Sequence, residues 1–299
     1  MVAAAVVVFS DMLDTPWPAP AKLNRFLHIV GRRTDGYHLL QTVFQFIDRC
    51  DYLSFALRAD GVICRQGEIG GVPAEDDLTV RAARLLQQTC GVSQGVAITI
   101  DKQLPLGGGL GGGSSDAATT LLVLNHYWQT GLSTAQLAAL GLQLGADVPV
   151  FLHGRAAWAE GVGEQLQPLD DHLDEPWFVV LVPPCTVATG AVFNDPELTR
   201  DSRPVTMQNF LAGNVGNDCE AVVYRRYPEV AAAAEWLAGH GQAHLTGTGA
   251  CVFAAFADRR TAAQVIARLP TSLSGFLARG LNRSPLQERL QQELRNASV

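Results

Sequence analysis

The sequence predicts an α+β fold of two lobes, and three features of the chain point to it. Its 299 residues, 47% hydrophobic and 17% charged, suit one large or two ordinary domains around a water-excluding cleft. Strand-like segments come in pairs separated by helical ones rather than in strict alternation. An acidic, proline-flanked stretch over residues 168–176 is typical of a connection between domains. We therefore expect an N-terminal lobe over residues 12–168 and a C-terminal lobe over residues 177–299.

The first lobe is expected to open with two long strands. Residues 22–30 alternate in strand fashion, and a glycine-containing turn over residues 31–36 leads to an extended region over 40–57. Apolar side chains at helical spacing predict a helix over residues 78–90, and Val-Ala-Ile-Thr-Ile at 96–100 is typical of a buried strand. The rest of this lobe is predicted as two helices, over residues 116–128 and 134–144, and two extended segments, over residues 149–152 and 155–160.

The second lobe is expected to begin with a buried strand over residues 177–182. A second glycine turn over residues 246–249 leads into a strand over 251–256, and a further strand is predicted over 275–281. The polar sequence after it is typical of a terminal helix over residues 284–296. Three more helices are predicted, over residues 217–226, 228–239 and 260–268.

Composition argues against several classes of function. The net charge of −7 and a pI near 5.5 disfavour a nucleic-acid surface, because affinity for the phosphate backbone comes from many Lys and Arg contacts. The six cysteines are scattered with no Cys-x-x-Cys pair, so neither a zinc site nor a disulfide framework is predicted. No run approaches the ~20 apolar residues of a membrane span. We expect a cytoplasmic protein with no resident metal and no nucleic-acid or membrane partner.

The beginning of the chain allows two interpretations. Residues 1–9 are apolar like the core of a signal peptide, but no Lys or Arg precedes them, and Asp11 and Asp14 follow. Met12 is a plausible alternative start. We therefore expect residues 1–11 to be a mobile extension rather than part of the fold.

The strongest signal for function is a glycine-rich run after the strand over 96–100. Six glycines occupy the seven positions 107–113, between Pro105 and the pair Ser114 and Ser115. Glycine lets backbone N–H groups approach a ligand closely, and a helix capped by either serine adds its positive end. The run predicts a phosphate-binding loop, although a simple flexible turn can have the same composition.

Two better-known phosphate loops do not fit this run. It contains Gly-x-Gly-x-x-Gly at Gly107, Gly109 and Gly112. A dinucleotide site also needs an acidic residue roughly 20 positions on, and no Asp or Glu lies between Asp116 and Asp147. A Walker loop needs Lys and then Ser or Thr after the last glycine, whereas here serine follows directly.

Three motifs together resemble the galactokinase, homoserine kinase, mevalonate kinase and phosphomevalonate kinase superfamily. They are Pro-Ala-Lys-Leu-Asn at residues 20–24, the glycine run with its two serines, and Leu-Thr-Gly-Thr-Gly-Ala-Cys at residues 245–251, in the superfamily's order. The resemblance spans residues 18–286. It implies a two-lobed α+β kinase with an N-terminal ribosomal-S5-like lobe and a C-terminal ferredoxin-like lobe. ATP is then the co-substrate, together with Mg²⁺.

Several departures from the general pattern are similar to one branch of that superfamily. The loop has an extra Gly-Gly and carries Asp116 where alanine is common. The chain also has Asp-Gly-Tyr-His at residues 35–38, Leu-Gly-Ala-Asp-Val-Pro at 144–149 and Glu-Gly-Val-Gly-Glu at 160–164. Members of that branch phosphorylate the 2-hydroxyl of a cytidine-diphosphate-linked polyol in the non-mevalonate route to isoprenoid precursors. The resemblance implies this small molecule as the substrate.

The resemblance assigns the chemistry to two charged residues. Asp147 stands at the position of the family's catalytic base, and Lys22 at that of its charge partner. An ammonium near a carboxylate keeps the carboxylate ionised and offsets charge on the transferred phosphoryl group, so the pair is physically coherent. Without the surrounding motifs, a turn aspartate and a solvated lysine would be the simpler interpretation.

ATP is expected to contact the glycine run and the residues that flank it. These are Lys102, Pro105, Gly107, Gly108, Gly109, Leu110, Gly111, Gly112, Gly113, Ser114 and Ser115. Lys102, Asp77 and Leu78 are candidates to flank the adenine, although the family often has asparagine where Asp77 stands. Either serine is a candidate to reach a magnesium ion carried by ATP.

The substrate is expected to be held by aromatic plates and one polar side chain. By resemblance, Tyr37 and Phe193 sandwich the cytosine and His38 hydrogen-bonds to it, since a base offers two flat faces and a polar edge. Asn24 lies on the same side of its strand as the catalytic lysine and is expected to bind the polyol. Thr189 resembles a position that contacts the diphosphate or polyol side.

Two rival functions stay open. A kinase of the same superfamily that acts on homoserine or mevalonate would not need the cytidine set of Tyr37, His38 and Phe193. A nucleotide-binding protein that has lost catalysis would not need Lys22 and Asp147.

Overall fold

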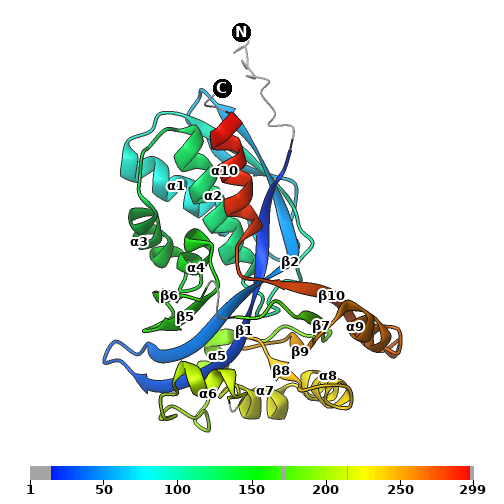
Figure 1. Cartoon of the computed structure of the whole chain (residues 1–299). Coiled ribbons are helices and arrows are strands. Elements are labelled where there is room, and N and C mark those ends of the chain that lie inside the picture. The colour runs from blue at the N-terminus through cyan, green and yellow to red at the C-terminus, as the bar shows by residue number, and fades with distance from the viewer. Residues whose placement is uncertain (1–14, 170–172, 214, 297–299) are drawn as a thin grey trace.

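The computed structural model describes residues 15–169, 173–213 and 215–296. The extension expected over residues 1–11 and part of the connection expected over 168–176 lie outside the described residues. Figure 1 shows an upper and a lower lobe, with two long strands passing from one to the other.

These two strands form an antiparallel pair, β1 (Trp17–Arg32) with β2 (His38–Arg58). Each is longer than the strand expected from the alternating pattern. The pairing shifts register at three points, because β1 carries irregularities that bend it and re-aim its side chains. The pair runs through both lobes and connects them (Figure 1).

Shorter strands complete the sheet of the first lobe. β4 (Gly95–Asp101) pairs antiparallel with β2, and β3 (Ile63–Gln66) pairs parallel with β4. β5 (Ala157–Glu160) pairs with another part of β2 and with β6 (Gln165–Pro168).

The helices between β3 and β5 all lie in the first lobe (Figure 1). α2 buries every residue from Ser115 to Leu124, which is typical of a central helix packed on all sides. Among the described helices of the whole chain, none is long and apolar enough to cross a membrane. The helices between β3 and β5 are α1 (Leu78–Cys90), α2 (Gly112–Tyr127), α3 (Thr134–Leu144) and α4 (Val148–His153).

The second lobe is an antiparallel sheet with helices around it. In the sheet, β7 lies between β10 and β9, and β8 pairs with β9. The strands are β7 (Trp177–Val182), β8 (His244–Leu245), β9 (Val252–Phe256) and β10 (Ser274–Leu281). The helices are α5 (Thr189–Phe193), α6 (Met207–Leu211), α7 (Glu220–Arg226), α8 (Pro228–Ala238) and α9 (Arg259–Ile266).

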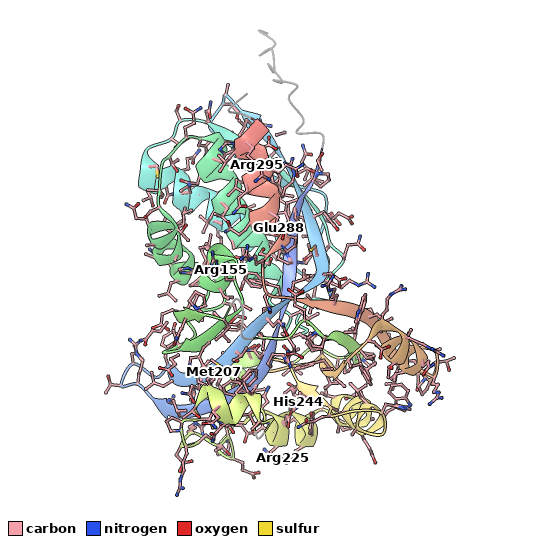
Figure 2. The ribbon with its side chains drawn as sticks, viewed as in Figure 1. Arg155, Met207, Arg225, His244, Glu288 and Arg295 are labelled. Carbon is pink, nitrogen blue, oxygen red and sulfur yellow. The ribbon has the colours of Figure 1, made fainter. Side chains whose placement is uncertain are left out.

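The end of the chain ties the lobes together. β10 pairs with β7 and, through Gly280 and Leu281, also with β2, so one sheet runs through both lobes. The following helix, α10 (Pro285–Asn296), returns to the first lobe, where Leu286 is fully buried in the same core as Trp17. Figure 2 shows Glu288 and Arg295 of this helix lying over the first lobe.

Two local expectations were wrong. Residues 149–152, expected to be extended, lie in helix α4, where Pro149 is favourable in the first turn. Residues 148–152 are all buried, so their sequence shows no alternation that separates a helix from a strand. The helix expected from residue 116 begins at Gly112, since the positive φ of Gly111, rather than a serine cap, ends the loop.

Candidate active site

Three segments far apart in the sequence meet at one place. The backbone N–H of Lys22 donates to the Leu110 carbonyl at 2.9 Å, which joins β1 to the glycine run. The backbone N–H of Cys251 donates to the Gly108 carbonyl at 3.1 Å, which joins the same run to the second lobe. Backbone hydrogen bonds therefore join the three motifs recognised in the sequence.

This packing requires glycine at two positions of the run. At Gly109, φ is +75° and a Cβ atom would lie 2.2 Å from the Thr246 carbonyl oxygen. At Gly111, φ is +73° and a Cβ atom would lie 2.9 Å from the Phe151 ring. Positive φ is unfavourable for other residues, and side-chain carbons do not approach other atoms so closely, so only glycine fits.

The run ends at the N-terminus of α2, which exposes backbone donors. Ser115 is the first residue whose N–H bonds within the helix, to the Gly111 carbonyl at 2.8 Å. The N–H groups of Gly112, Gly113 and Ser114 come before that residue, have no acceptor within the helix and can donate to a bound anion. All three residues line a cavity of about 730 Å³, whereas Ser115 is fully buried beneath it.

Lys22 and Asp147 form an ion pair in this cavity. Lys22 Nζ lies 3.1 Å from Asp147 Oδ2 and donates to Asn24 Oδ1 at 2.6 Å and to the Gly109 carbonyl at 3.0 Å. The Lys22 side chain is 3% exposed and that of Asp147 34% exposed, so the carboxylate is the accessible partner. Asp147 stands at the N-cap position of α4 without making a side-chain cap bond, which leaves its oxygens available to the cavity.

The same cavity carries the aromatic residues. The ring of His38, at the start of β2, stacks on Phe193 of α5 with centroids 5.0 Å and planes 23° apart. Both line the cavity together with Tyr37, which is 63% exposed. Thr189 Oγ1 lies 3.0 Å from Thr248 Oγ1, so α5 is held to the third motif.

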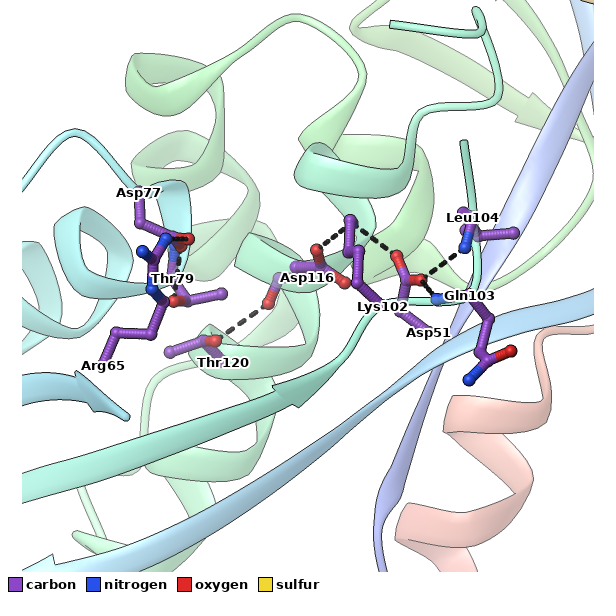
Figure 3. A network of polar contacts seen from close by, with 9 residues as sticks. All are labelled: Asp51, Arg65, Asp77, Thr79, Lys102, Gln103, Leu104, Asp116 and Thr120. Atoms are coloured by element: carbon purple, nitrogen blue, oxygen red, sulfur yellow. Dashed lines mark hydrogen bonds and ion pairs between the residues drawn. The ribbon is translucent and has the colours of Figure 1, made fainter. Parts of the chain in front are cut away.

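A buried network holds the start of the glycine run (Figure 3). Lys102 Nζ lies 2.5 Å from Asp51 Oδ2 and 2.6 Å from Asp116 Oδ2. Asp51 Oδ1 accepts hydrogen bonds from the backbone N–H groups of Gln103 at 2.7 Å and Leu104 at 2.8 Å. One carboxylate on β2 thus fixes the backbone that leads into the loop.

This network places two carboxylates around one ammonium. Burial, reinforced by the charge of Asp51, raises the pKa of Asp116 to about 7 in spite of Lys102. Burial also acts to lower the pKa of Lys102, but the two carboxylates outweigh it and raise that pKa. Asp116 Oδ1 is buried without a hydrogen-bond partner among the described residues. The lysine therefore stays charged while Asp116 titrates near neutrality.

Asp77 has a structural place outside the cavity. Its carboxylate caps α1 by accepting from the Thr79 N–H at 2.8 Å, and it pairs with Arg65 at 2.7 Å (Figure 3). The neighbouring Leu78 does line the cavity, as does Lys102. The Asp77 carboxylate is therefore engaged by the helix and by Arg65, and its contact with adenine stays a prediction.

Apart from Asp77 and Ser115, every residue proposed for ATP, substrate or catalysis lines this one cavity. Sequence reasoning missed Thr42 and Phe44, which line it from β2 and could have been found as alternate positions on one strand face. It also missed Asp51, which pairs with the lining residue Lys102, and Arg200, which donates to the lining residue His38. No local pattern marks either of these two.

The arrangement suits transfer of an anionic group to a hydroxyl. Backbone N–H groups, a buried ammonium, an accessible carboxylate and aromatic rings share one cavity. Among the described residues, no group of three His, Cys, Asp or Glu side chains is placed to hold a metal ion. The six cysteines are all free thiols.

The sequence matches two family models, one in each lobe. The GHMP kinases N terminal domain matches residues 77–155, and the GHMP kinases C terminal domain matches residues 203–275. The first match contains the glycine run and Asp147.

Curated relatives match almost the whole chain. The 4-diphosphocytidyl-2-C-methyl-D-erythritol kinase of Nitrosococcus oceani is 58% identical over 275 residues, which cover 92% of this chain and 98% of the relative. The protein of the same name from Halorhodospira halophila is 54% identical over 280 residues, with 93% and 97% covered.

Solved structures show the same architecture. A crystal structure of 4-(cytidine 5'-diphospho)-2C-methyl-D-erythritol kinase is 33% identical, with a TM-score of 0.76 and coverage of 89% of this chain and 98% of the other. A mevalonate kinase structure is 14% identical, with a TM-score of 0.63 and coverage of 90% and 99%, which is a likeness of fold alone.

Proposed function

The chain belongs to the 4-diphosphocytidyl-2-C-methyl-D-erythritol kinases of the GHMP kinase family, and we propose that it phosphorylates the 2-hydroxyl of that cytidyl polyol. It is an ATP-dependent kinase, as membership of this family implies. The reaction belongs to the non-mevalonate route to isoprenoid precursors.

One contact set carries the proposal for the mechanism. The Lys22 ammonium touches both the Asp147 carboxylate and the Gly109 carbonyl of the phosphate loop. A hydroxyl placed beside Asp147 would therefore also lie close to a phosphoryl group held by the loop. In-line transfer needs this proximity together with charge stabilisation.

Asp147 accepts or orients the proton of the attacking hydroxyl, while Lys22 offsets negative charge as the phosphoryl group moves. Because Lys22 is nearly fully buried, its charge acts with little screening by water. Asn24 accepts from the ammonium and is itself fixed by donating to Thr42 Oγ1 at 3.0 Å. This chain of contacts keeps the ammonium aimed at the reacting groups.

The ATP phosphates lie on the glycine run and the first N–H groups of α2. Magnesium, carried by ATP, would neutralise phosphate charge there. Ser114 is the serine that would bind this magnesium ion, because it lines the cavity beside those N–H groups, whereas Ser115 is fully buried. The adenine lies against Leu78, Pro105 and the stem of Lys102.

The cytidyl group lies among Tyr37, His38 and Phe193, and the polyol lies near Asn24 and Thr189.

The free thiols support a reducing, cytoplasmic location. The negative net charge supports a small-molecule substrate rather than a nucleic-acid partner.

A coupled ADP-release assay with three acceptors tests the substrate. We expect turnover with the cytidyl polyol and background rates with mevalonate and homoserine, because neither offers a base to the aromatic residues. Turnover of mevalonate or homoserine without turnover of the cytidyl polyol would contradict the proposal. ATP-analogue binding without turnover of any acceptor would indicate the non-catalytic alternative.

A further inference from the structure

Arg200 contacts the ring of His38, which is expected to hydrogen-bond to the cytosine. Its guanidinium donates to the carbonyls of Phe193 at 2.9 Å, Asp195 at 2.7 Å and Leu198 at 3.0 Å. Its Nε also donates to Nε2 of His38 at 3.2 Å. One side chain thus holds the segment after α5 and contacts His38 at the start of β2.

The contact with His38 determines where that ring carries its proton. A guanidinium has donors and no acceptor, so Nε2 of His38 must accept. A neutral imidazole that accepts at one nitrogen carries its hydrogen on the other. Neutral His38 is therefore the Nδ1–H tautomer. Nδ1 makes no hydrogen bond within the part of the chain that the structure describes, and His38 lines the cavity.

The surroundings keep the ring neutral. Burial lowers the pKa of His38, and the charges of Arg200 and Arg32 lower it further. Asp35, an acidic residue that lines the same cavity, is paired with Arg33 at 2.7 Å. At neutral pH the ring thus offers one donor and no second proton.

We propose that Arg200 is a positioning residue that fixes the Nδ1–H tautomer of His38, and that this tautomer selects cytosine over uracil. The inference rests on the proposed function, because it assigns the means by which that cytidyl site chooses its base.

The selection follows from the pattern of the two bases. Position N3 of cytosine is an acceptor, whereas N3 of uracil carries a hydrogen and is a donor. An Nδ1–H group directed at N3 donates a hydrogen bond to cytosine. With uracil, the same group faces the N3–H donor, and no hydrogen bond forms. A site built to hydrogen-bond a group rejects an analogue that leaves its buried polar atoms unpaired.

Kinetic discrimination between cytidyl and uridyl diphosphate polyols tests the proposal. In the wild type we expect kcat/KM to favour the cytidyl substrate strongly. In Arg200→Met the ring is free to adopt either tautomer, so the ratio should contract about tenfold, the equivalent of one hydrogen bond. The matched control is Arg226→Met, which removes another arginine bound to the same segment, through Asp195, without a contact to His38.

A second variant guards against simple loss of structure. His38→Gln leaves the three carbonyl contacts of Arg200 in place, and a side-chain amide can turn either its donor or its acceptor to the base. We expect it to lose discrimination as Arg200→Met does, and the double variant to lose no more than either single one, because both remove the same interaction. Retained discrimination in Arg200→Met beside its loss in His38→Gln would overturn the proposal.

Nitrogen-15 NMR of the unliganded protein separates this inference from the proposed function. The His38 shifts should show a protonated Nδ1 in the wild type and a mixture of tautomers in Arg200→Met. A protonated Nε2 in the wild type, or an equal loss of discrimination in Arg226→Met, sinks the proposal. A protein that shows the expected tautomer but does not phosphorylate the cytidyl polyol instead refutes the proposed function.

Discussion

At the scale of single residues, the most telling feature is the contrast in exposure within the ion pair. Lys22 is enclosed by Asn24 and the Gly109 carbonyl, while the Asp147 carboxylate remains open to the cavity. The lysine can therefore act only through charge and orientation. In the proposed mechanism, the aspartate is the member of this pair that exchanges a proton with the bound molecule.

We expect Asp147→Asn to lower kcat by about 10²–10⁴-fold, the usual contribution of a positioned base, while the affinity for a non-hydrolysable ATP analogue changes little. Asparagine keeps the size of the side chain but cannot accept a proton. Initial rates of ADP release and calorimetric binding measure the two effects. Glu235→Gln, which removes a carboxylate from an exposed position on α8, is the control. A kcat within threefold of the wild type would remove Asp147 from the role of base.

Single residues were predictable from sequence where a motif surrounds them. Lys22, Asp147 and the glycines stand in recognisable local patterns and do share one cavity. Asp51 lies inside a long strand, 53 positions from the N–H group of Leu104 that it binds, and Arg200 is 162 positions from His38. Only the folded chain brings such partners together, so no periodicity or spacing reveals them.

At the scale of elements, the glycine run is held at both ends by one ionic network. Lys102 follows β4 before the run, and Asp116 lies in the second turn of α2 after it. Asp51 on β2 binds the lysine and the backbone of the segment between them (Figure 3). The loop can consist of glycine because its flanks are rigid.

The titration of Asp116 should appear in the stability of the protein. Its pKa of about 7 in the folded state lies above the ordinary value of 3.8, so the folded protein binds the proton more tightly than the unfolded one. This contribution is fully present below the ordinary value and is lost as pH rises to about 7. Wild-type stability should therefore fall relative to Asp116→Asn over this range, by at most about 1.4 kcal/mol per pH unit.

Urea unfolding of both proteins at several pH values between 4 and 8 measures this difference. The Glu235→Gln variant again serves as control and should track the wild type. A constant difference between Asp116→Asn and the wild type across the series would mean that Asp116 is already ionised at the acidic end.

Elements were predictable where the sequence itself carries their boundaries. The helix expected over 134–144 was confirmed with the same bounds, because Ser133 and Gln136 form a capping box. Helix α4 was missed since its fully buried residues show no periodicity, and short elements such as α5 and β8 contain too few residues to give a pattern.

At the scale of the whole molecule, the last helix belongs structurally to the first lobe. α10 contributes Leu286 to the core around Trp17, and Arg289 lies over the Trp17 ring at 4.7 Å. The sheet is continuous from β2 through β10 into the second lobe. The two lobes should therefore unfold together.

We expect Leu286→Ala to lower the free energy of unfolding by about 2–5 kcal/mol, the usual cost of truncating a buried leucine. Leu294→Ala, on the same helix at a residue that is 47% exposed, should change it by less than about 0.5 kcal/mol. Denaturant unfolding followed by tryptophan fluorescence and by circular dichroism gives both values. Two separate transitions, with only one shifted in Leu286→Ala, would show that the lobes are independent.

The α+β fold in two lobes was confirmed, and it could be anticipated because three motifs occur in a fixed order along the chain. The return of the C-terminal helix to the first lobe could not. Its sequence shows one apolar stripe but does not state which surface that stripe covers.

The hydrogen bonds between the glycine run and the turn over residues 246–249 limit how this protein can be re-engineered. The turn comes from the second lobe, yet it supports the loop of the first through Thr246 and its neighbours. A chimera that borrows a second lobe from a kinase with another acceptor also replaces the scaffold under the nucleotide. Acceptor choice and nucleotide handling are thus not exchangeable modules, and a working hybrid must take the loop and its supporting turn from one parent.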